Sequence, residues 1–165
     1  MRLFVAVRPP LDVVDALGAL PRPAIDGVRW TTRDQWHVTL RFFGDVDDAD
    51  DIIDAMRLAP LENATARMGP HASMLGRGVV QLPVAGLDEL AAGVVDATRS
   101  FGDAPPSRPF HGHLTLARTK ARGVHQRALE LECAWPVRDV ELIRSHLGRG
   151  GAHYETISRF ALRRV

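Results

Sequence analysis

Short apolar runs, broken by Gly and Pro, dominate the first part of this chain. The run Leu3 to Val7 is typical of a buried strand, and Pro9-Pro10 ends it. A helix is expected over residues 11–20, because apolar side chains recur there at helical spacing, at Leu11, Val14 and Leu17. The chain thus opens with a strand followed directly by a helix.

Helices and strands alternate through the rest of the chain in an order that suggests two similar halves. An acidic run at residues 45–51 leads into an expected helix, whose apolar stripe is Ile52, Ile53, Met56 and Ala59. The other expected elements are strands at 28–31, 66–75 and 78–84, a helix at 87–100, a Pro-rich loop at 104–109, a short helix near 125–129, and strands at 137–145 and 154–162 around a glycine-rich turn at 148–151.

One short pattern occurs twice, and each copy lies in a predicted strand. His37-Val38-Thr39-Leu40 and His113-Leu114-Thr115-Leu116 both read HxTL, and they lie in apolar stretches at 36–43 and 110–117. Two copies are expected by chance in about one in a thousand chains of this composition. We therefore interpret the repeat as functional.

Strand geometry places the two polar residues of each motif on one face. Since side chains alternate across a strand, His37 and Thr39 share a face, and Arg41 and Phe43 join them if the strand is regular. By the same rule Arg118 is out of phase with His113 unless its strand bends. Two such strands facing each other would surround a cleft with two imidazoles and two hydroxyls.

This set of residues is suited to chemistry at phosphorus. Imidazole has an ordinary pKa near 6.5, so a pair can supply one base and one acid at neutral pH. One histidine would deprotonate the attacking water or hydroxyl, while the other protonates the leaving oxygen. Thr39 and Thr115 would donate to the non-bridging oxygens, and Arg41 could add a positive charge. The scheme requires no metal.

Composition sets the broad class. The 165 residues, 45% of them hydrophobic, can form one core shared by two lobes, so residues 1–165 are expected to be a single bilobal domain. The formal net charge of +1 argues weakly against a plain nucleic-acid binder. Cys133 is the lone cysteine, which excludes an internal disulfide. No window resembles a signal peptide or a membrane span, so a cytoplasmic monomer is expected.

The motifs and their surroundings resemble those of the 2H phosphoesterases, and most closely the RNA 2′,3′-cyclic phosphodiesterases, also called 2′-5′ RNA ligases. The similarity spans essentially the whole chain. It rests on the two HxTL motifs and on the segments Arg2 to Val7, Trp36 to Gly44, Arg108 to Arg118 and Ser145 to Phe160.

The resemblance implies an α+β fold, with duplicated lobes and two mostly antiparallel sheets flanking a central cleft. It implies metal-independent hydrolysis of RNA 2′,3′-cyclic phosphate ends to 2′-phosphates, with no cofactor. By motif, His37 matches the general acid and His113 the general base, while Thr39, Thr115 and Arg118 match phosphate-binding residues. Gly112 departs from the pattern, because relatives commonly have proline at that position.

Several alternatives remain open from the sequence. The same histidines could join RNA ends or act on a 2′-5′ linkage or a small cyclic nucleotide, and a cleft that only binds RNA ends is a second class of function. The spacing of His111 and His113 would also suit a metal. Aromatic side chains near the motifs could stack a base, namely Trp36, Phe42, Phe43 and Phe110.

Overall fold

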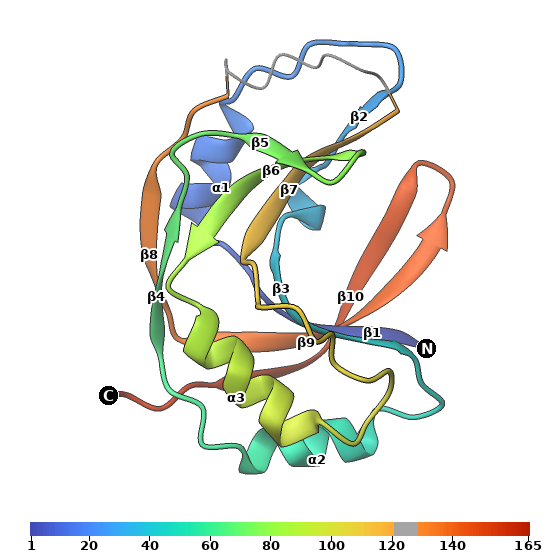
Figure 1. Cartoon of the computed structure of the whole chain (residues 1–165), viewed down its shortest axis with the longest axis vertical. Helices are drawn as coiled ribbons and strands as arrows, with labels where there is room; N and C mark the ends of the chain where they lie inside the picture. Colours follow the sequence, from blue (N-terminus) through green and yellow to red (C-terminus); the bar gives the residue numbers. More distant parts are fainter. Residues whose placement is uncertain (121–128) are drawn as a thin grey trace.

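In the computed structural model, which describes residues 1–120 and 129–165, ten strands join into one curled sheet that carries three α-helices (Figure 1). The elements in chain order are β1 (Arg2–Val7), α1 (Leu11–Gly18), β2 (Val28–Trp30), the 3₁₀ helix η1 (Arg33–Gln35), β3 (Val38–Asp45), α2 (Asp50–Leu58), β4 (Ala64–Met68), β5 (Ser73–Leu75), β6 (Val79–Ala85), α3 (Asp88–Thr98), β7 (His113–Thr119), β8 (Cys133–Val137), β9 (Asp139–Gly148) and β10 (Gly151–Ala161).

The sheet has two halves, which meet between the two motif strands. Its strand order is β10-β9-β1-β3-β7-β6-β4-β8, with β2 added to β7 and β5 to β6. β3 and β7 run antiparallel and join through the pair Val38 and Leu114. The predicted α+β class is confirmed: antiparallel ladders make up the sheet, and the helices pack against it.

The C-terminal hairpin completes the first half of the sheet. β9 pairs along β1, from Arg2 with Ser145 to Ala6 with Glu141, and β10 pairs along β9. The hairpin extends past the end of β1, and its tip projects away from the rest of the sheet (Figure 1). Residues from the two ends of the chain therefore lie next to each other and next to the first motif.

Two helices cover the face of this half that lies opposite the hairpin tip. α2 and α3 pack side by side, α3 against β3 and α2 against β10 (Figure 1). As predicted, Ile52 and Met56 of α2 are buried. In α1 the buried residues are Val13 and Leu17, whereas Leu11 is 70% exposed. The expected position of Leu11 in the buried stripe is wrong, because it is the first residue of the helix and faces solvent.

The strand predictions fail where the chain bends. The strand expected at 66–75 is two strands, β4 and β5, because Gly69 turns the chain at a φ of 97° and leaves no room for a Cβ against the Leu131 carbonyl. β8 was not expected. Pro136 is unfavourable in most strands, but β8 lies at the sheet edge, where it pairs with β4. The short helix expected near 125–129 lies, apart from its last residue, outside the described residues.

Candidate active site

The two HxTL motifs meet at one pocket. Because β3 and β7 pair antiparallel at Val38 and Leu114, each motif presents its histidine and threonine to the same side of the sheet. All four of these side chains line a cavity of about 540 Å³. Its lining includes three arginines and, among the described residues, no carboxylate. The lining residues are Arg2, Phe4, Arg29, Thr31, Gln35, His37, Thr39, Phe42, His113, Thr115, Arg118, Ser145, Leu147, Gly148, Gly151, Ala152 and Tyr154. This lining is suited to an anion.

His37 is held in one orientation by its neighbours. Its Nδ1 lies 2.6 Å from the Gln35 carbonyl oxygen and must carry a proton to donate there. Nε2 lies 3.1 Å from Oγ1 of Thr39, so in the neutral ring Nε2 accepts from that hydroxyl. The ring packs between Phe4 and Tyr154, at centroid distances of 4.9 and 5.1 Å. Nε2 is therefore the nitrogen available for proton transfer.

The surroundings of His37 disfavour its charged form. Burial lowers the pKa of His37 from 6.5 to about 4, although the hydrogen bond to the Gln35 carbonyl opposes the shift. Positive charge lowers this pKa further, from Arg8, His113 and Arg118. In the free protein the ring is therefore neutral at pH 7.

His113 makes the same kind of local hydrogen bond as His37, but that bond is exposed to solvent. Its Nδ1 lies 2.9 Å from the carbonyl oxygen of His111, two residues earlier, as in the first motif. The ring stacks on His111 at a centroid distance of 5.8 Å. Within the described ranges, no group of three or more His, Cys, Asp or Glu side chains is placed to hold a metal ion. His111 and His113 therefore have no third such side chain among the described residues to complete a metal site there.

A β-bulge brings Arg118 to the pocket. Along β7, Thr115 pairs with Gln81 and Ala117 with Val80, so Leu116 is an extra residue without a partner in β6. The extra residue reverses the alternation, and Arg118 joins His113 and Thr115 on the pocket side. Alternation in a regular strand would have turned Arg118 away from the face of His113, and the bulge in β7 is the irregularity that brings it back.

Thr31 supports this bulge and connects it to the first motif. Its backbone N–H donates to the Leu116 carbonyl over 2.9 Å, and its hydroxyl lies 2.7 Å from the Thr115 carbonyl oxygen. The same hydroxyl oxygen accepts from the indole N–H of Trp36, the residue before His37, over 2.9 Å. The bulge carbonyls are therefore satisfied by the segment that leads into the first motif.

A matching bulge in β3 takes Arg41 away from the pocket, and the expectation that Arg41 shares the face of His37 is wrong. Ala6 pairs with Thr39 and Val5 with Arg41, so Leu40 is an extra residue and the alternation reverses. Arg41 is 3% exposed. Its guanidinium points to the end of α3, where it donates to the carbonyl oxygens of Thr98, Phe101 and Asp103.

The same bulge exchanges two phenylalanines. Phe43 was expected on the face of His37, but it is fully buried in the core. Phe42 lines the pocket instead and is 40% exposed, with the guanidinium of Arg2 5.0 Å from its ring centroid. Trp36 is also buried, so of the four aromatic candidates named from the sequence, Phe42 is the one in the pocket lining.

Gly112, where the motif pattern departs from that of relatives, is required by a close backbone contact. A Cβ at this position would lie 2.2 Å from the Val84 carbonyl oxygen. The Gly112 carbonyl accepts a hydrogen bond from the Val84 N–H over 2.9 Å. The chain therefore enters the second motif pressed against the end of β6, where a side chain does not fit.

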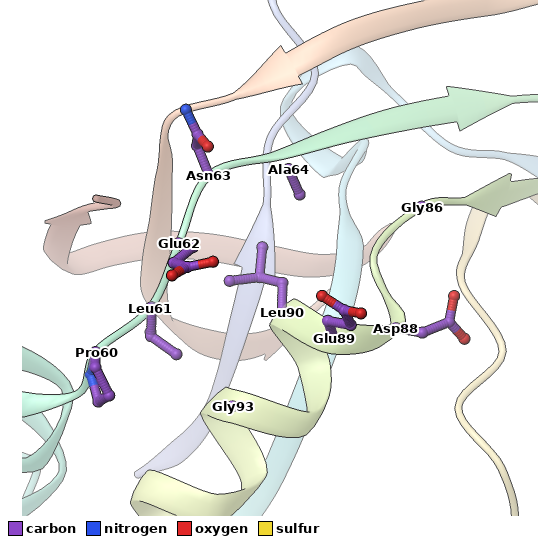
Figure 2. A pocket seen from close by; sticks show the side chains of 10 residues that line it. All are labelled: Pro60, Leu61, Glu62, Asn63, Ala64, Gly86, Asp88, Glu89, Leu90 and Gly93. Atoms are coloured by element: carbon purple, nitrogen blue, oxygen red, sulfur yellow. The ribbon is translucent and has the colours of Figure 1, made fainter. Parts of the chain in front are cut away.

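A second cavity, of about 510 Å³, lies apart from the motifs (Figure 2). It is bordered by the chain between α2 and β4 and by the first turns of α3. Its charged side chains are the carboxylates of Glu62, Asp88 and Glu89. A negatively charged lining repels phosphate, so this cavity does not share the chemistry of the first.

Sequence reasoning missed the part of the site that comes from distant segments. Arg2 and Arg29 lie on β1 and β2, and no motif marks them. Each could be found only after the strand pairing was known.

None of the helices in the described part of the chain has the length and apolar content needed to cross a membrane.

Comparisons with known proteins show similarity of sequence and of fold. No sequence-family model matches the chain. It is 30% identical to the RNA 2′,3′-cyclic phosphodiesterase of Thermus thermophilus over 181 aligned positions, which cover 99% of this chain and 91% of the relative. Its fold matches the crystal structure of TT0787 of Thermus thermophilus, with a TM-score of 0.81, 29% identity, and coverage of 99% of this chain and 98% of the other. Escherichia coli LigT in complex with 3′-AMP matches with a TM-score of 0.76, 26% identity, and coverage of 98% and 97%. The chain belongs to the RNA 2′,3′-cyclic phosphodiesterase family of the 2H phosphoesterase superfamily.

Proposed function

We propose that this chain hydrolyses RNA 2′,3′-cyclic phosphate ends to 2′-phosphomonoesters, without a metal, by general acid and base catalysis from two histidines. One observation carries the proposal: His37, Thr39, His113 and Thr115 converge with Arg118 on one pocket that has no carboxylate among its described lining residues. The name of the Thermus relative supports the substrate class. The complexes of LigT with 3′-AMP, ATP and NADP⁺ support binding of a nucleotide.

Each residue has a defined part in the reaction. Nε2 of His113 takes a proton from water as its oxygen bonds to phosphorus. The bond from phosphorus to the 3′ oxygen breaks, and Nε2 of His37 gives that oxygen a proton, which leaves a 2′-phosphate and a 3′-hydroxyl. The hydroxyls of Thr39 and Thr115 and the guanidinium of Arg118 donate to the non-bridging oxygens as charge gathers on them.

The acid and base roles follow the family resemblance, and the local electrostatics set a condition on them. The low pKa of His37 means that the free ring carries no proton at neutral pH. Acting as the acid, the ring must gain one when the anionic phosphodiester enters, because a negative charge beside it raises the pKa of His37. In the opposite assignment His37 is the base, and its neutral ring can accept a proton without first changing its protonation state. The two assignments predict opposite pH dependences for the residual activity of a His37 variant.

The test is turnover of a defined RNA end in EDTA. An oligonucleotide ending in a 2′,3′-cyclic phosphate is incubated with the purified protein, and the product is compared chromatographically with 2′- and 3′-phosphorylated standards. We expect the 2′-phosphate. A 3′-phosphate product, or loss of activity in EDTA, would contradict the proposal. The reverse reaction with a 5′-hydroxyl end uses the same groups, but water at its molar excess favours hydrolysis.

Substitution of the histidines tests the mechanism. His37→Ala and His113→Ala should each lower the rate by roughly 10²–10⁴-fold, since each removes one proton-transfer group. His153→Ala is the matched control, because His153 is an exposed histidine that does not line the pocket. Near-normal turnover by either motif variant would refute the two-histidine mechanism. Far-UV circular dichroism must show that a variant with lowered activity is still folded.

A further inference from the structure

Two arginines face each other across the strand pair beside the second motif. Arg29 of β2 and Arg118 of β7 are direct antiparallel partners, and both side chains line the pocket. No carboxylate of the described residues lies within 4.0 Å of either guanidinium. Like charges directly opposite each other destabilise a sheet. An anionic ligand between or beside them would remove this repulsion.

The two guanidiniums occupy different parts of the pocket. Arg118 is among the charges that lower the pKa of His37, and Arg29 is not. The guanidinium of Arg29 lies instead against the tip of the C-terminal hairpin, where its NH1 atom is 3.1 Å from the place that a Cβ on Gly151 would take. Arg118 is thus near the reacting groups, while Arg29 lies at the rim formed by β2 and the hairpin.

Two side chains with nitrogen donors pack over Gly151 at this rim. Gly151 has a φ of 115° and carries no side chain, and the place that a Cβ would take is closed off by the Arg29 guanidinium and by the Gln35 amide nitrogen, 3.3 Å from the same Cβ position. That amide already donates to the Ala152 carbonyl over 2.8 Å, which fixes its place. The guanidinium of Arg29 makes no hydrogen bond to any residue in the described part of the chain, so its donors are available at the entrance to the pocket.

We propose that Arg29 binds the phosphodiester that joins the terminal nucleotide to the preceding one, so that this chain prefers RNA ends over nucleoside 2′,3′-cyclic monophosphates. The inference rests on the proposed function and adds a specificity-determining residue, which would recognise a polynucleotide end through a second phosphate contact. Arg118 holds the reacting phosphate beside the histidines. Arg29, one strand further out, holds the next phosphate along the chain.

The test compares three substrates that share the same reacting end and differ in what precedes it. They are a nucleoside 2′,3′-cyclic monophosphate, a dinucleotide with the same cyclic end, and that dinucleotide with a neutral methylphosphonate linkage. A hydrogen bond to a charged group contributes about 1.5–3 kcal/mol, so kcat/KM should be roughly 10-fold or more higher for the natural dinucleotide than for the other two. Arg29→Gln should abolish most of this advantage, so that kcat/KM falls by a larger factor on the natural dinucleotide than on the mononucleotide. Arg29→Lys should restore part of it.

Arg57→Gln in α2 is the matched control, because Arg57 is an exposed arginine far from the pocket that pairs with Asp54. Equal loss on all three substrates would assign Arg29 to the reacting phosphate and overturn the inference. An unchanged preference in Arg29→Gln would overturn it as well. Wild-type protein that turned over none of the three would refute the proposed function itself, which separates the two failures.

Discussion

Replacing His37 with glutamine should make the folded protein less sensitive to acid. The unfolded chain binds a proton at His37 with the ordinary pKa of 6.5, whereas in the folded protein the pKa of His37 is about 4. Between these values the unfolded state holds more protons, so stability falls as pH falls from 6.5 toward 4. Glutamine is neutral throughout, and the variant lacks this contribution.

The size of the effect follows from the shift. A difference of about 2.5 pKa units corresponds to about 3.4 kcal/mol in full, of which about 2.5 kcal/mol is expressed between pH 7.5 and pH 4.5. Glutamine also loses ring packing against Phe4 and Tyr154. That loss is the same at both pH values, and it cancels when the change with pH is compared between the two proteins.

The assay is urea unfolding at several pH values between 4.5 and 7.5, followed by tryptophan fluorescence. The free energy of unfolding of the wild type should fall on acidification by about 2–3 kcal/mol more than that of His37→Gln. Parallel pH dependences of the two proteins, within about 0.5 kcal/mol, would show that the folded state does not disfavour protonation of this ring, and the reasoning from burial would fail.

Three further predictions address the mechanism and the fold. In His37→Gln, His113 is the remaining member of the catalytic pair: the residual kcat/KM should rise with pH if His113 is the base, and a residual rate that falls with rising pH would exchange the acid and base roles. Arg41→Met should cost about 2–4 kcal/mol in urea unfolding, because the buried Thr98 carbonyl and the part-buried carbonyls of Phe101 and Asp103 lose their donor, yet leave kcat/KM within about twofold; a large rise in KM would instead show that Arg41 contacts the substrate. Gly112→Ala should destabilise by about 1–3 kcal/mol through contact with the Val84 carbonyl, and an unchanged unfolding midpoint would contradict the close approach.

The expected elements were found where hydrophobic spacing is strong and local. The strand at residues 3–7 and the helices of the middle region match β1, α2 and α3 closely. Errors cluster where a non-local contact overrides the local pattern, as at Gly69, where the Leu131 carbonyl leaves no room for a side chain. Edge position made β8 possible despite Pro136, and edge position depends on which strands pair.

The candidate site divides in the same way. The sequence alone determined that His37 shares a face with Thr39 and His113 with Thr115, because alternation over two residues is a property of any extended strand. That the two pairs face one cleft depended on the pairing of β3 with β7. Which arginine reaches that cleft depended on the two bulges at Leu40 and Leu116. Arg41 and Arg118 have the same chemistry and similar spacing from their motifs, yet Arg41 is buried in the core and Arg118 lines the pocket.

Only the tertiary structure decided these bulges, the rim formed by Arg29, and the neutral state of His37. A bulge is set by the register of a strand against its neighbours, and those neighbours are distant in the sequence. The low pKa of His37 likewise comes from side chains of β1 and β10, at opposite ends of the chain, which exclude water from the ring. Periodicity within a strand is local and can be read from the chain, whereas register, burial and electrostatics arise from segments that meet only on folding.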